Sequence, residues 1–469
     1  MPASERAFLD ALMRVATLAM SRREAPLGAP QPVAEIAAAI PLDPPRDGIP
    51  FDEVVSRLEA IVARSVNTAS PRFHNQLFSG LQPVALVGDF VGTLLNTTMA
   101  TWEASPAATA VELALLARLC RVTGFEHGDG TFTDGGSESN LLALLAARHR
   151  ACPAIRESGR WPDRPLVAFV SADAHYSVAT AAQAAGIGLA NVERIPVDAR
   201  GRMRPEALAA ALASARARGA RPFFVCATAG TTFRGSVDPI GAIAEVCRGE
   251  DVWLHVDACL GAPALLSPRH RHLLEDVRQA DSVVWDAHKL IGVPLTCSAL
   301  IVREAGRLEA ACAPDGAAYL YHGDGDPDLG RRGLKCARRV GALKLWATWM
   351  HLGDAGLAAR IERLFERAAF AAALIRDTPG LALAAPVETV AVCFRPAAPD
   401  GVDAGALTRQ VRARLLADGD AFLNYGPLEG VDTLRLLVSN PEVSDADLRA
   451  VVDASARARL AVLELVETP

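Results

Sequence analysis

Short apolar runs alternate with helical stretches through the middle of the chain, and this alternation predicts the fold. These β-branched or apolar runs occupy residues 166–170, 192–195, 222–227, 252–256, 282–285 and 299–302. The helical stretches around them occupy residues 111–121, 138–150, 178–185, 205–217 and 240–247. Apolar strands that alternate with helices are typical of a mostly parallel sheet with helices on both faces. We therefore expect an α/β fold with such a sheet at its centre.

The first part of the chain is expected to form a helical arm. In residues 1–20, charged side chains interrupt the apolar positions at helical spacing, which predicts an amphipathic helix and neither a signal peptide nor a membrane span. Prolines recur through residues 26–50 and predict a non-helical connector to a helix at 52–63. The apolar face of the arm would pack on the body of the protein or on a partner subunit.

The pattern changes again after the last apolar run. Glycine, proline and charged residues over 313–335 predict a long mobile loop. A long helix is expected at 340–373, followed by strands at 389–395 and 433–439 that flank a helix at 405–416, which together indicate a small α+β domain. We therefore expect an N-terminal helical arm, a large domain and a small C-terminal domain, at residues 1–70, 71–338 and 339–469.

Composition excludes several classes of partner. The chain has 48 basic and 54 acidic residues, a formal charge of −6, so no excess of positive charge attracts nucleic acid or an anionic membrane. The nine cysteines are scattered without a C-x-x-C pair, which indicates reduced thiols in a cytoplasmic protein. The His/Arg cluster at 269–272 lacks a third ligand at useful spacing, so we expect no metal site.

Lys289 is the first candidate for covalent chemistry. The apolar run 282–285 leads to His288 and Lys289, and Leu290 and Ile291 follow. A lysine that forms a Schiff base must be partly desolvated so that its amine is neutral and nucleophilic, and this setting supplies that condition. A lysine after a strand is more often an ordinary surface residue, so the neighbouring motifs decide between the two interpretations.

Three further motifs suit pyridoxal 5′-phosphate (PLP). Asp257 ends an apolar strand and could hold a pyridine nitrogen protonated, although an Asp at a strand end also caps helices. The glycine-rich turn in 134–140 opens a helix and could bind a phosphate monoester, or be a simple helix cap. His175 follows the strand 166–170 and could stack on a flat ring or be structural. Because all these groups follow strands, we expect them at the carboxyl edge of one sheet, where ligands bind.

From about residue 71 to 451 the chain resembles the group II PLP-dependent decarboxylases, most closely the glutamate, cysteine sulfinate and aspartate decarboxylase branch. The motifs that carry this resemblance are 71–80, 96–99, 102–106, 135–140, 175–177, 227–232, 254–258, 288–289 and 434–441. The resemblance implies the aspartate-aminotransferase-like fold, fold type I. It also implies an intertwined homodimer with the active site at the subunit boundary, and an amino acid as the small-molecule substrate.

The resemblance also assigns the site. It implies Lys289 as the lysine bound to PLP, His175 stacked on the ring, Asp257 on the ring nitrogen and Ala258 against the other face. It places the phosphate contacts on Gly136, Ser137, Ser282 and His288, and lines the cofactor cavity with Thr228. The positions implied to meet the substrate are Gln76, Phe78, Thr98 and Arg435, of which an arginine suits a carboxylate.

The chain departs from the family at two places. The stretch 322–333 lacks the loop tyrosine that delivers a proton in animal members, so either another group such as His322 or His175 protonates the carbanion, or oxygen intervenes and an aldehyde forms. Asp286 replaces an asparagine near the phosphate, and its carboxylate would repel a dianion. We expect decarboxylation of an acidic amino acid (aspartate, cysteine sulfinate or glutamate) to the amine, with oxidative deamination, another fold type I aminotransferase or lyase, and a non-catalytic protein as alternatives.

Overall fold

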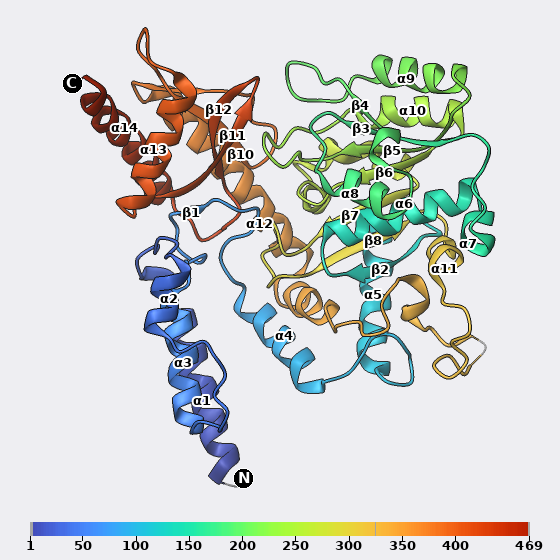
Figure 1. The fold of residues 1–469 in the computed structure, drawn as a ribbon, viewed down its shortest axis with the longest axis horizontal. Helices are drawn as coiled ribbons and strands as arrows, with labels where there is room; N and C mark the ends of the chain where they lie inside the picture. Colours follow the sequence, from blue (N-terminus) through green and yellow to red (C-terminus); the bar gives the residue numbers. More distant parts are fainter. Residues whose placement is uncertain (1–2, 324, 468–469) are drawn as a thin grey trace. The chain divides into compact units, whose positions relative to one another are not determined.

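A seven-stranded sheet forms the centre of the larger of two compact units, which comprises Leu81–Ala369 and Ala385–Ala391 (Figure 1). The structure is a computed structural model that describes residues 3–323 and 325–467. The strand order is β2-β8-β7-β6-β5-β3-β4, and β8 runs antiparallel to both of its neighbours whereas the other pairs are parallel. The prediction of a mostly parallel α/β sheet is confirmed. The strands are β2 (Asp129–Thr133), β3 (Leu166–Ser171), β4 (Val192–Ile195), β5 (Arg221–Thr228), β6 (Trp253–Asp257), β7 (Ser282–Asp286) and β8 (Ser298–Val302).

The helices of this unit bury apolar faces against the sheet. α6 and α8 pack with β3, β5 and β8 in one apolar cluster, which includes Leu144, Ala182, Phe224 and Leu300. The α-helices are α4 (Pro83–Leu95), α5 (Pro106–Thr123), α6 (Gly136–Ala151), α7 (Ala154–Ser158), α8 (Ser177–Ala184), α9 (Pro205–Ala217), α10 (Ile240–Glu250) and α11 (Arg307–Cys312). Short 3₁₀ helices are η2 (Leu189–Asn191), η3 (Ala262–Leu266), η4 (Arg271–Gln279) and η5 (Leu329–Arg332).

The parallel strands bring several chain segments to one edge of the sheet. β2, β3, β5, β6 and β7 run in the same direction, so the residues that follow them lie along the same carboxyl edge. β7, β6, β5 and β3 are immediate neighbours in the sheet, and β8 separates β7 from β2. The segments after these strands are therefore the natural place for a ligand site.

The smaller unit comprises Met1–Gly80, Phe370–Ala384 and Val392–Pro469. Its five-stranded sheet has the order β1-β11-β12-β10-β9. Its elements are α1 (Ala3–Met20), η1 (Ser21–Glu24), α2 (Val33–Ala39), α3 (Phe51–Arg64), β1 (Phe73–His74), β9 (Leu381–Leu383), β10 (Ala391–Pro396), α13 (Ala404–Ala417), β11 (Phe422–Leu428), β12 (Val431–Leu437) and α14 (Asp445–Glu467). α12 (Ala342–Asp377) continues from the larger unit into this one and is interrupted at Gly353, whose φ is 64°.

Two expectations about chain organisation differ from the structure. Residues 26–50 are not wholly non-helical, because the proline-free run Val33–Ala39 forms α2 directly after Pro32, whose position before a helix is tolerated. The two compact units group residues 71–80 and most of the C-terminal region with the N-terminal arm, so they do not follow the three-part division at 70 and 338. The amphipathic helix at the N-terminus is confirmed as α1.

Candidate active site

Lys289 lies in the turn after β7, with its amine against a carboxylate. The Lys289 N–H donates to the Asp286 carbonyl at 3.2 Å, and Lys289 Nζ lies 2.9 Å from Asp286 Oδ2. Burial alone would lower the pKa of Lys289, but Asp286, Cys259 and Asp257 together outweigh burial and raise it. The amine is therefore a cation stabilised by Asp286, which differs from the expectation that burial would make it neutral.

Asp286 is buried at the end of β7 and has three polar neighbours. Ser298 Oγ donates to its Oδ1 at 2.5 Å, and His288 Nε2 lies 3.7 Å from its Oδ2. Burial would raise the pKa of Asp286, but Lys289, His288 and Ser298 lower it below the ordinary value. An ionised carboxylate therefore stands beside the candidate cofactor lysine.

Asp257 ends β6, the strand next to β7, and its carboxylate is held on both sides. Asn140 Nδ2 donates to Oδ2 at 3.0 Å, and the Cys259 N–H donates to Oδ1 at 3.2 Å. Asn140 comes from α6, so the helix that follows the glycine-rich turn also orients this acid. Ala258, the next residue of the chain, is fully buried.

His175 follows β3 and is partly buried. Ser177 Oγ lies 2.8 Å from His175 Nδ1, and the Ser177 N–H also reaches this nitrogen. Burial lowers the pKa of His175, and the charges of Asp257, Lys289 and Asp286 also act on it. The groups predicted at the ends of β3, β6 and β7 thus lie within electrostatic range of one another.

The glycine-rich turn faces the same groups. Gly135 has a φ of 138°, which disfavours any side chain, and Gly136 begins α6. A Cβ at Gly136 would overlap Cys259 Sγ and lie 3.2 Å from Asp286 Oδ2. Ser137 lies exposed in the first turn of the helix, where backbone N–H groups are unpaired and favour an anion.

Thr228 provides an independent sign of a ligand. It ends β5 between the strands that carry Asp257 and His175, and it is buried. Its N–H donates to Asp238 Oδ2 at 2.7 Å, but its Oγ1 has no hydrogen-bond partner among the described residues. A buried hydroxyl without a partner leaves capacity for a bound group. Together with the glycine cradle, Lys289 and Asp257, it fits PLP.

Two predicted contacts are placed differently by the structure. Ser282 begins β7, level with His255 of β6 and at the opposite end of the strand from Asp286. Its hydroxyl is fully buried and accepts from Trp253 Nε1 at 2.8 Å. The expected phosphate contact of Ser282 is therefore corrected to an internal one. His288 remains at the carboxyl edge, with its Nδ1 against the Cys297 backbone.

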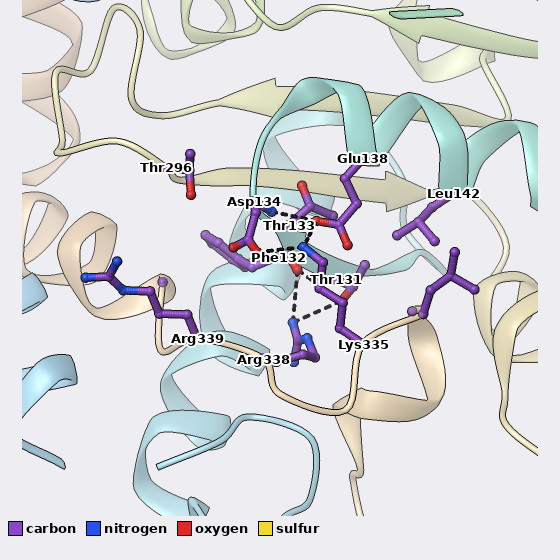
Figure 2. A pocket seen from close by; sticks show the side chains of 13 residues that line it. Thr131, Phe132, Thr133, Asp134, Glu138, Leu142, Thr296, Lys335, Arg338 and Arg339 are labelled. Atoms are coloured by element: carbon purple, nitrogen blue, oxygen red, sulfur yellow. Dashed lines mark hydrogen bonds and ion pairs between the residues drawn. The ribbon is translucent and has the colours of Figure 1, made fainter. Parts of the chain in front are cut away.

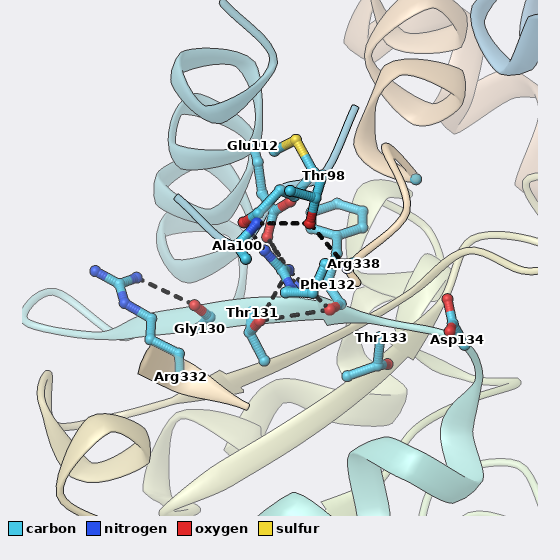
Figure 3. Close-up of polar contacts among 12 residues, drawn as sticks. Thr98, Ala100, Glu112, Gly130, Thr131, Phe132, Thr133, Asp134, Arg332 and Arg338 are labelled. Carbon is cyan, nitrogen blue, oxygen red and sulfur yellow. Dashed lines mark hydrogen bonds and ion pairs between the residues drawn. The ribbon is translucent and has the colours of Figure 1, made fainter. Parts of the chain in front are cut away.

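Thr98 supports the backbone of a neighbouring segment. Its hydroxyl donates to the Cys336 carbonyl at 2.8 Å and accepts from the Arg338 N–H at 3.2 Å (Figure 3). The same segment carries a buried ion pair in which Arg338 Nη2 lies 2.6 Å from Glu112 Oε1. These contacts give Thr98 a structural role in this unit.

The other expected substrate residues belong to the smaller unit. Arg435 is buried on β12, and its Nη2 donates to the Asn75 carbonyl at 2.5 Å. Burial lowers the pKa of Arg435 to about 10. Gln76 is exposed in the loop after β1, and the ring of Phe78 packs 6.2 Å from that of Phe73.

A separate pocket is lined by residues that flank the glycine-rich turn and by the segment after η5. Lys335 enters it and pairs with Asp134 Oδ2 at 2.6 Å and Glu138 Oε2 at 2.8 Å (Figure 2). Lys289, Asp257 and His175 do not line this pocket. The ion pairs of Lys335 with Asp134 and Glu138 hold the segment after η5 against the start of α6.

Sequence reasoning missed three buried residues beneath the site, namely Asn140, His255 and Cys259. Asn140 and His255 stood inside recognised motifs, and their burial with Asp257 depends on the packing of α6 on β6. Within residues 3–323 and 325–467, no cluster of acids, histidines and cysteines could hold a metal, and no helix is long and apolar enough to cross a membrane.

Comparison with known proteins identifies the family. The family model for the pyridoxal-dependent decarboxylase conserved domain matches residues 32–397. The acidic amino acid decarboxylase GADL1 of Mus musculus is 36% identical over 438 residues, covering 90% of this chain and 80% of the mouse protein. The human cysteine sulfinic acid decarboxylase is 37% identical over 412 residues, covering 84% of this chain and 83% of the human protein.

Solved structures agree with these sequence relatives. The crystal structure of mouse CSAD in apo form superposes with a TM-score of 0.92 at 32% identity, covering 97% of this chain and 99% of that one. The rice TDC structure with PLP and tryptamine gives a TM-score of 0.90 at 27% identity, covering 98% and 99%. The fold is therefore fold type I, as expected. The chain belongs to the pyridoxal-dependent decarboxylase family and is a PLP-dependent amino-acid decarboxylase.

Proposed function

We propose that this protein removes the α-carboxylate of an acidic L-amino acid and releases CO₂ and the corresponding amine. The observation that supports it is the grouping of Lys289, Asp286, Asp257 and His175 at one sheet edge, in a chain related to acidic amino acid and cysteine sulfinic acid decarboxylases. Aspartate, cysteine sulfinate and glutamate are the candidate substrates.

The cofactor would be held by groups from four neighbouring strands. We assign Lys289 the covalent bond to the PLP aldehyde, Asp257 the ring nitrogen, and His175 and Ala258 the two ring faces. The phosphate would lie at Gly136, Ser137 and His288, and the buried Thr228 hydroxyl would meet a polar atom of the cofactor. When bound, PLP supplies the electron-withdrawing ring that takes up the electrons released as CO₂ leaves.

The substrate side of the proposal rests on Arg435, Gln76 and Phe78, because the Thr98 hydroxyl is already bonded to the backbone of Cys336 and Arg338. Arg435 carries a guanidinium, a planar group with several donors, which is the kind of group that suits a carboxylate. Exposed apolar side chains on α1 and α4, such as Met13 and Leu94, support a homodimer. Nine free cysteines support a reducing, cytoplasmic location.

A second outcome is favoured by one sequence feature. The stretch 322–333 contains no tyrosine, so oxygen could consume the reactive α-carbon before a proton reaches it. That reaction converts the amino acid, O₂ and water into an aldehyde, CO₂, ammonia and hydrogen peroxide. It differs from simple decarboxylation in every product except CO₂.

One experiment tests both outcomes. The purified protein is incubated with PLP and a panel of acidic, aromatic and aliphatic L-amino acids, and CO₂, amine, aldehyde and peroxide are measured together. We expect CO₂ and amine in equal amounts from an acidic substrate, and neither from Lys289→Ala. Aldehyde and peroxide matching CO₂ would support the oxidative reaction, and keto acid without CO₂ would contradict both.

A further inference from the structure

A line of buried polar side chains runs beneath the site through an otherwise apolar core. Trp253, His255 and Asp257 alternate along β6 and so lie on one face of the sheet. Asn140 of α6 and Ser282 of β7 join them, and His255, Asn140 and Ser282 are at most 1% exposed. Because buried polar groups are costly unless they are hydrogen-bonded, the direction of each bond in this line is constrained.

The Asn140 side-chain amide fixes which atom donates and which accepts in its hydrogen bonds with Asp257 and His255. Its nitrogen faces Asp257 Oδ2, since the flipped amide would turn an oxygen against a carboxylate. Its Oδ1 can then only accept, and it lies 2.9 Å from His255 Nε2, so that nitrogen carries a proton. Burial lowers the pKa of His255 to about 4, so the ring is neutral and its Nδ1 must accept.

The line begins at a group that can only donate. The proton accepted by His255 Nδ1 comes from Ser282 Oγ, 2.8 Å away. Ser282 Oγ in turn accepts from the indole Nε1–H of Trp253 at 2.8 Å. An indole nitrogen is a donor and never an acceptor, so it fixes this end of the line.

The hydrogen bonds continue from Asn140 to His175 in the same donor-to-acceptor direction. Asn140 Nδ2 donates its other hydrogen to Ser177 Oγ at 2.9 Å. The Ser177 hydroxyl then donates to His175 Nδ1 at 2.8 Å, where the Ser177 N–H also points. Burial lowers the pKa of His175, so its ring is neutral and its one proton lies on Nε2.

We propose that Asn140 is a positioning residue whose single amide both holds the Asp257 carboxylate and fixes the tautomer of His175, so that His175 presents an Nε2–H donor to the bound cofactor and substrate. The consequence for catalysis rests on the proposed function, whereas the tautomer does not. All five bonds from Trp253 to His175 run in one direction. In its resting form, His175 therefore donates a hydrogen bond from Nε2 to an acceptor atom and does not remove a proton.

The tautomer is measurable without turnover. The full-length protein is labelled with ¹⁵N in its imidazoles, and the His175 resonances are identified by their loss in His175→Gln. We expect the wild type to show an unprotonated Nδ1 and a protonated Nε2 near neutral pH, with or without PLP. A proton on Nδ1 would overturn the proposal directly.

Variants test the contribution of Asn140. Asn140→Leu conserves volume and removes the amide, so we expect both His175 tautomers to be populated and the Kd for PLP to rise about tenfold to a hundredfold, the usual effect of losing a hydrogen bond to a charged group. Ser139→Ala is the matched control, because Ser139 is equally buried on α6 but bonds Thr133 outside the line. It should leave the His175 tautomer unchanged.

A second pair of variants applies if Asn140→Leu does not fold. Ser177→Ala should mix the tautomers, and Ser177→Thr, which restores the hydroxyl, should recover the wild-type spectrum. An unchanged tautomer and unchanged PLP affinity in folded Asn140→Leu, or an unchanged tautomer in Ser177→Ala, would refute the positioning role. A wild-type protein with the expected tautomer that binds no PLP would instead refute the proposed function and leave the assignment intact.

Discussion

Asp286→Asn should strengthen PLP binding, because it removes a negative charge from the side of the site where the phosphate is expected. Asp286 Oδ2 lies 3.2 Å from the position of a Cβ on Gly136, the residue that begins α6. A phosphate at that helix end would therefore lie within several ångströms of a buried carboxylate. The asparagine keeps the shape of the side chain and can still accept from Ser298 Oγ.

The magnitude follows from Coulomb's law. Two unit charges about 6 Å apart at an effective dielectric constant of about 20 repel by roughly 3 kcal/mol. The Lys289 cation, 2.9 Å from Asp286 Oδ2, offsets part of this repulsion. We expect the Kd for PLP to fall by about tenfold, since about 1.4 kcal/mol corresponds to a factor of ten.

The pH dependence of PLP binding follows from the pKa of the Asp286 carboxyl. Burial opposes the ionisation of Asp286, but Lys289, His288 and Ser298 lower its pKa in the ligand-free protein, whereas a phosphate dianion would raise it. A tenfold difference in Kd corresponds to a change of about one in the pKa, so the Asp286 carboxyl stays ionised above pH 7 with or without PLP. The advantage of the asparagine variant should therefore be about constant between pH 7 and 9.

Titration of the cofactor-free protein with PLP, followed by protein fluorescence between about pH 7 and 9, measures both quantities above the second pKa of the phosphate near 6. Pyridoxine 5′-phosphate, which has no aldehyde, separates the Asp286 effect from the titration of Lys289. Asp281→Asn, which removes a carboxylate just before β7, is the matched control and should leave the Kd unchanged. Equal affinities of wild type and Asp286→Asn for PLP throughout this pH range would refute the reasoning.

Three further variants test the packing around the site. Gly136→Ala should cost about 1–3 kcal/mol of unfolding free energy because its methyl group overlaps Cys259 Sγ, and adding Cys259→Ala should recover much of this cost in denaturant titrations. Thr228→Val should leave the unfolding free energy of the ligand-free protein within about 1 kcal/mol but raise the Kd for PLP about tenfold, since its hydroxyl has no hydrogen-bond partner in the part of the chain that the structure describes; an unchanged Kd would mean that this hydroxyl meets no ligand. Glu112→Gln should lower the unfolding free energy by about 3–5 kcal/mol because it leaves the Arg338 guanidinium buried without its counter-ion, and a loss below 1 kcal/mol would contradict the importance of that pair.

Local sequence was enough to predict the sheet and the residues at its edge. The strands β3 and β7 are short apolar runs, and the groups that follow such strands must meet at one edge of a parallel sheet, which placed Asp257, Lys289 and His175. Ser282 shows the weakness of this approach. The motif gave its strand correctly, but a hydroxyl at the beginning of β7 faces Trp253 and His255, far from the edge at which the strand ends.

The remaining features depend on contacts between distant segments. Asn140 and Asp257 are 117 positions apart, and their hydrogen bond exists because α6 packs on β6. The pairing of Arg338 with Glu112 likewise joins segments 226 positions apart. Local composition does not distinguish the residues of these two pairs from other polar residues, because only their burial in the folded chain brings them together.

The charge of Asp286 also bears on how the α-carbon regains a proton after CO₂ leaves. His322 is 61% exposed and pairs with the exposed Glu103, and a neutral His175 that donates through Nε2 is a weak acid. Lys289 Nζ, which Asp286 at 2.9 Å holds as a cation, by contrast carries a proton inside the site, and without Asp286 a smaller fraction of the amine would be protonated. Asp286→Asn removes this support for the cation, so the variant that binds PLP more tightly should also release more aldehyde and peroxide for each CO₂. An unchanged product ratio would separate the two roles of Asp286 and leave the proton to another group.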